Sequence, residues 1–338
     1  MKKAVITGVR QAALVETTDP TPREDWAVVK VHIAPMCTEY KAFLAGTPQE
    51  YLGHEAAGEV VAVAQPGKVK VGDRVVAMPL AGCGRCYLCL SGEYIHCQDA
   101  PDFAALHGSL EGTATYAQYL LKQDWLLMPI PDDLTYEQGS LACCALGPSF
   151  GAFQRLALSA LDTVLITGLG PVGLGAVANA LFRGSRVIAV ESQSWRARRA
   201  LDMGAEIVLD PASPDIKGEI LERTGGRGVH CALDCSGTVP AQRLCLEATR
   251  RRGQVAFVGE CSDELNLQVS PDLLRKGLTI HGSWHYNLNH YAGIVEVIRR
   301  SPLMSMLVSH TLPLSEVQDA LTLSASPEHA KILLQPWA

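Results

Sequence analysis

Charged and aromatic side chains are scarce in this 338-residue chain, where 19% of the residues are charged and 6% are aromatic. With 48% hydrophobic residues, the composition excludes a disordered chain or a coiled coil. The 29 Lys and Arg residues are outnumbered by 35 Asp and Glu residues, so the basic surface of a nucleic-acid-binding protein is missing. No internal repeat or low-complexity linker divides the chain. We expect a globular protein with room for two domains.

Long apolar segments are also rare. The apolar run at residues 4–9 ends at Arg10, too early for the core of a signal peptide. Residues 163–182 carry no charge, but they contain several glycines and a proline. We interpret this run as a buried strand, a turn and a helix, because a membrane span is normally free of such breaks. The sequence therefore predicts a cytoplasmic protein that does not contact membranes.

Cysteine, by contrast, is abundant, with 11 residues. Four of these cysteines follow one another closely, namely Cys83, Cys86, Cys89 and Cys97. Without an export signal the thiols are expected to be reduced and available to a metal. Four thiolates complete a tetrahedral zinc shell with no open position. The sequence predicts a structural zinc lobe at about residues 82–98.

The two halves of the chain differ in their pattern. Residues 1–150 contain short strand-like runs such as 27–33 and 58–64, and lack long helical periodicity. From about residue 160, strands alternate with helices. The expected strands are 163–167, 186–190, 206–209, 229–233, 254–258 and 278–282, and the expected helices 172–183, 195–203, 214–224, 239–252 and 288–300. Such alternation predicts an α/β fold with a doubly wound parallel sheet. We expect Arg250, Arg251 and Arg252 to end a helix before Gly253.

A glycine-rich motif follows the first of these strands. Its residues Gly168, Gly170, Pro171, Val172 and Gly173 open the next helix. This context is typical of a dinucleotide site, because the glycines admit a pyrophosphate to the helix N-terminus.

The second strand of this half ends at Glu191. A carboxylate there accepts hydrogen bonds from the adenosine ribose and repels a 2′-phosphate, which favours NAD over NADP. The nearby Arg196 and Arg198 weaken this preference, so NADP stays open as the less favoured cofactor.

Further candidate ligands are scattered along the first half. Cys37, His54 with Glu55, and Cys143 with Cys144 suit a catalytic zinc that keeps an open fourth position. Their spacing alone does not link them into one site.

Taken in order, these motifs resemble those of the zinc-containing medium-chain alcohol dehydrogenase/reductase family. The resemblance rests on Gly53-His54-Glu55-x2-Gly58, on Val71-Gly72-Asp73-Arg74-Val75, on the four cysteines, and on 168–173 with Glu191. It covers nearly the whole chain. It implies a mainly β GroES-like catalytic domain at 1–150, a Rossmann NAD-binding domain at 151–286, and a segment 287–338 that returns to the catalytic domain.

The resemblance also implies a catalytic zinc bound by Cys37, His54 and Cys144. Cys143 remains an alternative third ligand, and Glu55 would support the ligands or replace one of them. Two zinc ions per chain follow, one catalytic and one structural.

The sequence departs from the family after Cys37, where Cys37-Thr38-Glu39-Tyr40 is one residue short of the usual Cys-x-Ser/Thr-Asp. Either Thr38 and Glu39 supply the hydroxyl and the carboxylate across a deletion, or Glu39 and Tyr40 occupy those places. Thr38 is the first candidate to start a proton relay. The distal histidine of the family is replaced by Lys41 or Ala42.

The predicted activity is hydride transfer between an alcohol, with a secondary alcohol or polyol favoured, and NAD. The expected partners are this small molecule and further copies of the chain, as a homodimer or homotetramer. One alternative is a zinc-independent alkene or quinone reductase on the same fold. Another is a cofactor-binding protein that has lost the chemistry and holds only the lobe zinc.

Overall fold

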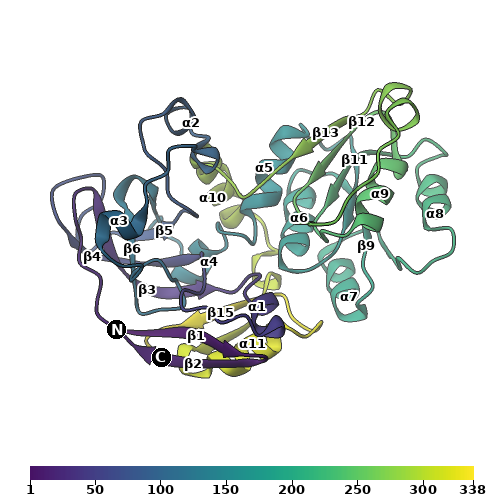
Figure 1. Ribbon diagram of the computed structural model, residues 1–338. Coiled ribbons are helices and arrows are strands. Elements are labelled where there is room, and N and C mark those ends of the chain that lie inside the picture. Colours follow the sequence, from purple (N-terminus) through teal and green to yellow (C-terminus); the bar gives the residue numbers. More distant parts are fainter. The chain divides into compact units, whose positions relative to one another are not determined.

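A computed structural model describes all residues of the chain, 1–338, and divides them into two compact units (Figure 1). Unit 1 comprises Met1–Cys144, Asn287–Arg300 and Val308–Ala338, and unit 2 comprises Ala145–Tyr286 and Ser301–Leu307. Each unit is built around its own sheet.

Unit 2 contains a six-stranded, all-parallel sheet in the order β10-β9-β8-β11-β12-β13. Its strands are β8 (Thr163–Thr167), β9 (Arg186–Val190), β10 (Ile207–Leu209), β11 (Val229–Asp234), β12 (Thr249–Phe257) and β13 (Thr279–Gly282). Its helices are α5 (Gly147–Arg155), α6 (Pro171–Phe182), α7 (Ser194–Met203), α8 (Ile216–Arg223) and α9 (Val239–Ala248). Strand β8 is buried along its whole length, as expected for a central strand covered on both faces. The predicted doubly wound sheet is confirmed.

Unit 1 is mainly β. A seven-stranded sheet runs β14-β15-β3-β4-β5-β7, with β6 also paired to β3, and β1 and β2 form a separate hairpin. The strands are β1 (Lys2–Gly8), β2 (Gln11–Glu16), β3 (Trp26–Pro35), β4 (Ala56–Val63), β5 (Arg74–Ala77), β6 (Tyr119–Gln123), β7 (Leu127–Pro129), β14 (Val308–Pro313) and β15 (Lys331–Gln335). The helices are α1 (Tyr40–Ala45), α2 (Tyr87–Leu90), α3 (Phe103–His107), α4 (Tyr136–Ser140), α10 (Tyr291–Arg300) and α11 (Val317–Ser324).

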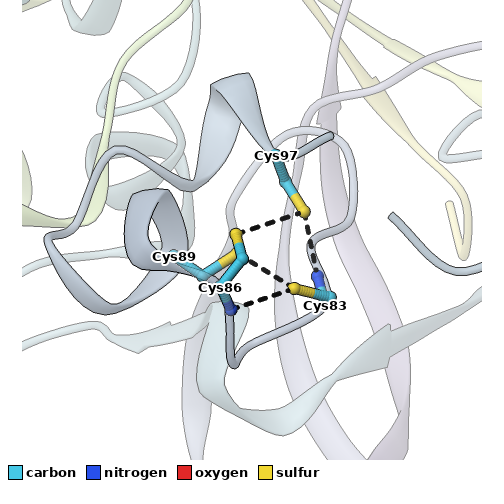
Figure 2. A group of neighbouring side chains, drawn as sticks. All are labelled: Cys83, Cys86, Cys89 and Cys97. Atoms are coloured by element: carbon cyan, nitrogen blue, oxygen red, sulfur yellow. Dashed lines mark hydrogen bonds between the residues drawn. The ribbon is translucent and has the colours of Figure 1, made fainter. Parts of the chain in front are cut away.

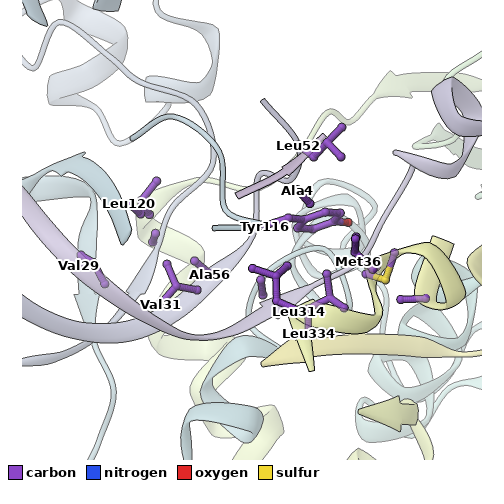
Figure 3. Close-up of a cluster of buried hydrophobic side chains, with 14 of the residues drawn as sticks. Ala4, Val29, Val31, Met36, Leu52, Ala56, Tyr116, Leu120, Leu314 and Leu334 are labelled. Atoms are coloured by element: carbon purple, nitrogen blue, oxygen red, sulfur yellow. The ribbon is translucent and has the colours of Figure 1, made fainter. Parts of the chain in front are cut away.

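The core of unit 1 joins both ends of the chain. Buried side chains from β1, β3 and β4 pack with Leu314 and Leu334 from the last 30 residues or so (Figure 3). Tyr116 lies in this cluster and is fully buried. Because β15 pairs with β3, the C-terminal strand is part of the same sheet as the residues that precede Cys37.

One predicted helix is wrong at its end. Helix α9 stops at Ala248, and the residues 249–257 form strand β12 instead of continuing to Arg252. The backbone N–H of Arg252 donates to Lys276 O (2.7 Å), and Gly253 does not take the left-handed conformation of a helix stop. Between the pairs Val229–Thr249 and Cys231–Gln254 the ladder is irregular, so the arginines lie in a bulge of a parallel strand. Helical spacing alone could not reveal this, because the pairing partner is distant in sequence.

No helix in the structure combines the length and the apolar character that crossing a membrane requires. The uncharged run 163–182 forms β8, a turn and α6, as the glycines and proline indicated.

Candidate metal centres and cofactor site

The four closely spaced cysteines converge in unit 1 around the short helix α2 (Figure 2). Their sulfur atoms all lie within 4.8 Å of one another. Cys83 Sγ is 3.9 Å from Cys89 Sγ, and Cys86 Sγ is 3.9 Å from Cys97 Sγ. A tetrahedral zinc with Zn–S distances of about 2.3 Å separates its sulfurs by about 3.8 Å. The donor set therefore fits a zinc ion closely.

Backbone groups support these sulfurs. The N–H of Cys86 donates to Cys83 Sγ (3.2 Å), and the N–H of Cys83 donates to Cys97 Sγ (3.3 Å). Hydrogen bonds from backbone N–H groups lower the pKa of the Cys83 thiol to about 6, which favours the thiolate that binds metal. Gly84 permits the tight turn between the first two cysteines with its left-handed φ of 70°.

The lobe is tied to the rest of unit 1 by a buried tyrosine and by the chain's later part. Tyr94 is fully buried, and its hydroxyl donates to Pro79 O (2.8 Å). Asn287 accepts from the N–H of Ile95 (3.2 Å) and donates to Glu93 Oε2 (2.7 Å). These contacts hold the lobe in place from a segment almost 200 residues away.

A second cluster brings together Cys37, His54, Glu55 and Cys144, whose ligand atoms also lie within 4.8 Å of one another. Cys37 follows β3, and Cys144 precedes α5. His54 and Glu55 lie directly before β4. His54 Nε2 lies 3.4 Å from Cys144 Sγ. Cys143 is fully buried but does not belong to this cluster. The fold thus unites residues that spacing alone left separate, and of the two adjacent cysteines it brings Cys144 to the others.

Glu39 is the residue that fixes the imidazole of His54. Its Oε1 lies 2.9 Å from His54 Nδ1, and its Oε2 accepts from the hydroxyl of Tyr116 (2.7 Å) and the N–H of Cys37 (3.1 Å). Burial opposes ionisation of Glu39, but the hydrogen bonds from His54 and Tyr116 outweigh it and lower the pKa of this carboxyl to about 2. In the neutral imidazole, whose Nδ1–H donates to this carboxylate, Nε2 carries the lone pair and lies on the side of Cys144 Sγ.

The cluster concentrates negative charge. Hydrogen bonding with Cys144 lowers the pKa of the Cys37 thiol. Burial opposes protonation of His54, but contacts with Cys37 and Glu39 raise its pKa to about 11. Such a shift shows that the surroundings favour a cation between these groups, which is the electrostatic condition for a divalent metal. Two thiols and one imidazole are the donor chemistry that zinc prefers.

Glu55 forms an ion pair with Lys331 that the sequence did not reveal. Its Oε1 accepts from Lys331 Nζ (2.6 Å), and both side chains are buried. Its Oε2 accepts from the N–H of Cys144 (2.9 Å). Burial raises the pKa of Glu55 to about 7, although the charge of Lys331 opposes the shift. Glu55 therefore positions Cys144, while its Oε1 lies 4.0 Å from His54 Nε2.

Tyr116 and Lys331 had no signal in the sequence. Tyr116 lies in a loop before β6, and Lys331 is the first residue of β15. Neither is near Cys37 or Glu55 in sequence, so only the tertiary structure shows their contacts. The side chain of Thr38 is exposed beside Cys37, and Tyr40 begins α1.

The glycine-rich motif in unit 2 has the geometry of a dinucleotide turn. Gly168 has a φ of 79°, and a Cβ at Gly173 would meet Gly168 O at 1.9 Å, so both positions require glycine. Pro171 and Val172 form the first turn of α6. A Cβ at Gly170 would lie 3.9 Å from the Arg196 guanidinium. The backbone can therefore approach a phosphate at the N-terminus of α6.

Glu191 lies beside the same turn. Its carboxylate accepts from the N–H groups of Leu169 (2.7 Å) and Gln193 (2.9 Å). It thereby holds the glycine-rich turn and keeps a negative charge where the adenosine ribose of a dinucleotide would lie.

Comparison with known proteins now places the chain. The family description "Alcohol dehydrogenase GroES-like domain" matches residues 23–132, and "Zinc-binding dehydrogenase" matches residues 171–300. Sorbitol dehydrogenase of Bacillus subtilis (strain 168) is 31% identical over 350 residues, which cover 99% of this chain and 97% of that protein. The chain belongs to the zinc-containing medium-chain alcohol dehydrogenase family. The predicted family and the predicted GroES-like domain are confirmed.

Two further comparisons also indicate this family. An uncharacterized zinc-type alcohol dehydrogenase-like protein of Escherichia coli (strain K12) is 30% identical over 354 residues, covering 99% of this chain and 98% of that protein. The solved structure of an alcohol dehydrogenase from Thermus sp. ATN1 has a TM-score of 0.90 at 26% identity and covers 99% of both chains. This alcohol dehydrogenase is accordingly an oxidoreductase that acts on CH–OH groups, and the family implies zinc and NAD or NADP. The comparisons give no support to an alkene or quinone reductase.

Proposed function

We propose that this alcohol dehydrogenase oxidises a secondary alcohol or polyol with NAD, at a zinc ion held by Cys37, His54 and Cys144. The observation that carries the proposal is the convergence of these three side chains, with Glu39 bound to the imidazole. Sorbitol dehydrogenase and 2R,3R-butanediol dehydrogenase of B. subtilis, by their names, act on such substrates. A second zinc in the lobe of Cys83, Cys86, Cys89 and Cys97 would make two per chain.

The residues of the chain prepare the site for this chemistry. When bound, the zinc supplies a Lewis acid that lowers the pKa of the substrate hydroxyl, and NAD supplies the hydride acceptor. Glu39 fixes the tautomer of His54, and Tyr116 fixes Glu39. Glu55 fixes the backbone at Cys144, and Lys331 compensates its charge. These supports hold Cys37, His54 and Cys144 together, and a zinc bound by these three ligands would keep its fourth position for the alcohol.

Glu191 supports the preference for NAD. Its carboxylate beside the glycine-rich turn would repel the 2′-phosphate of NADP. If the enzyme also uses NADP more weakly, Arg196 or Arg198 would be the residue that binds its 2′-phosphate.

We propose that residues 1–150 with 287–338 form the catalytic domain and that residues 151–286 form the NAD-binding domain. We further propose a homodimer or homotetramer in the cytoplasm. The eleven cysteines are all free thiols, which fits a reducing compartment.

The proposal is tested by measuring NADH formation with primary alcohols, secondary alcohols and polyols, with and without a zinc chelator. We expect chelator-sensitive turnover that is highest with a secondary alcohol or polyol. Zinc content is measured on the same preparation. A protein that retains only the lobe zinc and turns over none of the alcohols would contradict the catalytic assignment.

The proton relay is tested at Thr38, the exposed hydroxyl next to Cys37. Thr38→Ala is expected to lower kcat by roughly 10²–10⁴-fold, which is the contribution of a positioned proton-transfer group. Thr38→Ser keeps a hydroxyl at this position and should retain most of the wild-type kcat. Tyr40→Phe is the matched control for the other register of the motif. If Tyr40→Phe loses turnover and Thr38→Ala does not, the relay begins at Tyr40.

A further inference from the structure

A group of arginines in unit 2 has no part in the proposed reaction. Arg186, Arg223, Arg227 and Arg250, together with His230, line a cavity of about 310 Å³. Arg186 and His230 lie at the amino ends of β9 and β11, and Arg250 lies near the start of β12. The cavity is thus at the edge of the parallel sheet from which the strands begin.

The arginines outnumber the carboxylates around them. Arg186 is paired with Glu206 and also donates to Arg223 O (2.9 Å). Arg223 donates to Glu219 O (3.1 Å), and Asp162 is the other nearby acid, bound to the Ser159 hydroxyl (2.8 Å). Of the four arginines, only Arg186 therefore forms an ion pair.

Two of the arginines are left without partners. The side chains of Arg227 and Arg250 make no hydrogen bond or ion pair within the chain, and the buried Nε of Arg250 has no acceptor. Buried polar groups are almost always satisfied, so an orphaned guanidinium donor beside a cavity points to a ligand. His230 accepts the N–H of Thr163 at Nδ1 (3.0 Å), so the neutral imidazole carries its proton on Nε2 as a further donor.

We propose that this cavity is an anion site that binds a phosphoryl group, either as inorganic phosphate or as the phosphate of a small ester. Guanidinium groups match the oxygens of phosphate in bidentate geometry, and every charged group that is unpaired here is a donor. The volume is at the lower end of the roughly 300–1,000 Å³ of small-molecule sites, which suits a small phosphorylated molecule.

The site is distinct from the dinucleotide turn. Thr163, at the cavity, begins β8, and Gly168 follows the last residue of the same strand. A strand rises about 3.3 Å per residue, which places the two sites roughly 15 Å apart at opposite ends of β8. The phosphates of NAD therefore do not account for the arginines.

The experiment is a calorimetric titration of inorganic phosphate into the zinc-loaded enzyme saturated with NADH, at constant ionic strength set with chloride. NADH fills the dinucleotide turn, so that phosphate reports on the other site. Arg250→Gln is compared with Arg251→Gln, which removes the same charge from the exposed neighbouring residue outside the cavity. Arg227→Gln removes an exposed arginine whose side chain makes no hydrogen bond or ion pair, so the substitution should leave the fold intact.

We expect saturable phosphate binding that Arg250→Gln and Arg227→Gln each weaken at least tenfold, as expected for losing a charged hydrogen bond. Arg251→Gln should bind like the wild type. Phenyl phosphate, whose only charged group is its phosphate, is a second titrant that separates the two sources, because tighter binding than inorganic phosphate identifies an ester. Absence of saturable binding by the wild type for both titrants, or equal affinities of all the variants, would overturn the proposal.

Discussion

Glu39 lies where the sequence after Cys37 departs from the family pattern. Its carboxylate reaches His54 Nδ1 at 2.9 Å, which is the contact expected if Glu39 supplies the carboxylate of the motif across a deletion. Glutamate is one methylene longer than the aspartate that the family pattern contains. Tyr116 then holds the other carboxylate oxygen at 2.7 Å, which offsets the freedom of the longer side chain.

Removing this charge should weaken the catalytic metal site. Glu39→Gln keeps the shape but loses the carboxylate that fixes the imidazole, so zinc affinity at that site should fall about 10–100-fold. Competition with a chromophoric chelator measures it. Glu50→Gln, at an exposed carboxylate, is the control. Equal retention of zinc by both variants would remove Glu39 from the support of His54.

The contribution of another carboxylate, that of Asp272, to the stability of the fold should depend on pH. Arg243 donates to both oxygens of Asp272 at 2.6 Å, which lowers the pKa of this carboxyl to about 2. Because the folded pKa lies below the usual 3.8, the group stabilises the fold above about pH 4 and loses this effect as the pH falls towards 2.

Asp272→Asn should therefore lower the free energy of unfolding by about 1 kcal/mol at pH 6. The difference from the wild type should shrink at pH 3. Urea unfolding at both pH values measures it, with Asp263→Asn, an exposed carboxyl, as the control. A difference that does not change with pH would show that Asp272 acts by packing and not by charge.

Among the elements, α2 and β12 depend on contacts that are not local. Helix α2 has four residues, far too few to be stable alone, and it contains Cys89 and begins directly after Cys86, two of the four converging cysteines. Strand β12 contains three arginines that fit a helical end equally well. Its parallel pairing with β11 and β13 determines its conformation.

Cys86→Ala tests what holds the lobe. With one of four ligands lost, zinc per chain should fall from two to one, and residues 83–97 should become accessible to protease. Elemental analysis and limited proteolysis measure the two effects. Cys261→Ala, outside both clusters, is the matched control. A variant that still holds two zinc ions would show that the lobe does not bind metal through Cys86.

At the scale of the whole molecule, the candidate metal ligands and the candidate cofactor residues belong to different units. All candidate zinc ligands belong to unit 1, whereas the glycine-rich turn and Glu191 belong to unit 2. Each unit has a buried hydrophobic cluster of its own. Ligands that bind one unit should therefore stabilise that unit directly.

Calorimetry tests this separation. NADH at about 100 times its Kd should stabilise the transition of unit 2 by about 2.7 kcal/mol, and a zinc chelator should lower the midpoint of unit 1. Unit 2 contains Trp195 and Trp284, and the other three tryptophans lie in unit 1, so a Trp195→Phe, Trp284→Phe variant gives a fluorescence signal from unit 1 alone that assigns the transitions. A single transition that moves equally with both additions would show that the units unfold as one.

The sequence alone determined several features of this protein. Alternating strands and helices predicted the parallel sheet, and the bounds of β8 and β9 agree residue for residue. The cysteine spacing predicted that Cys83, Cys86, Cys89 and Cys97 converge, because all four lie within 15 residues of the chain. The glycine-rich turn was equally visible, since its geometry depends on residues within six positions.

Only the tertiary structure decided the rest, because the relevant groups are distant in sequence. It placed Cys144 beside Cys37 and His54, and brought Tyr116 and Lys331 to the carboxylates that support them. It also showed that Arg250, which the sequence placed at the end of a helix, lies in β12 and lines a cavity. Local patterns fix elements, whereas ion pairs, metal sites and cavities depend on which elements become neighbours.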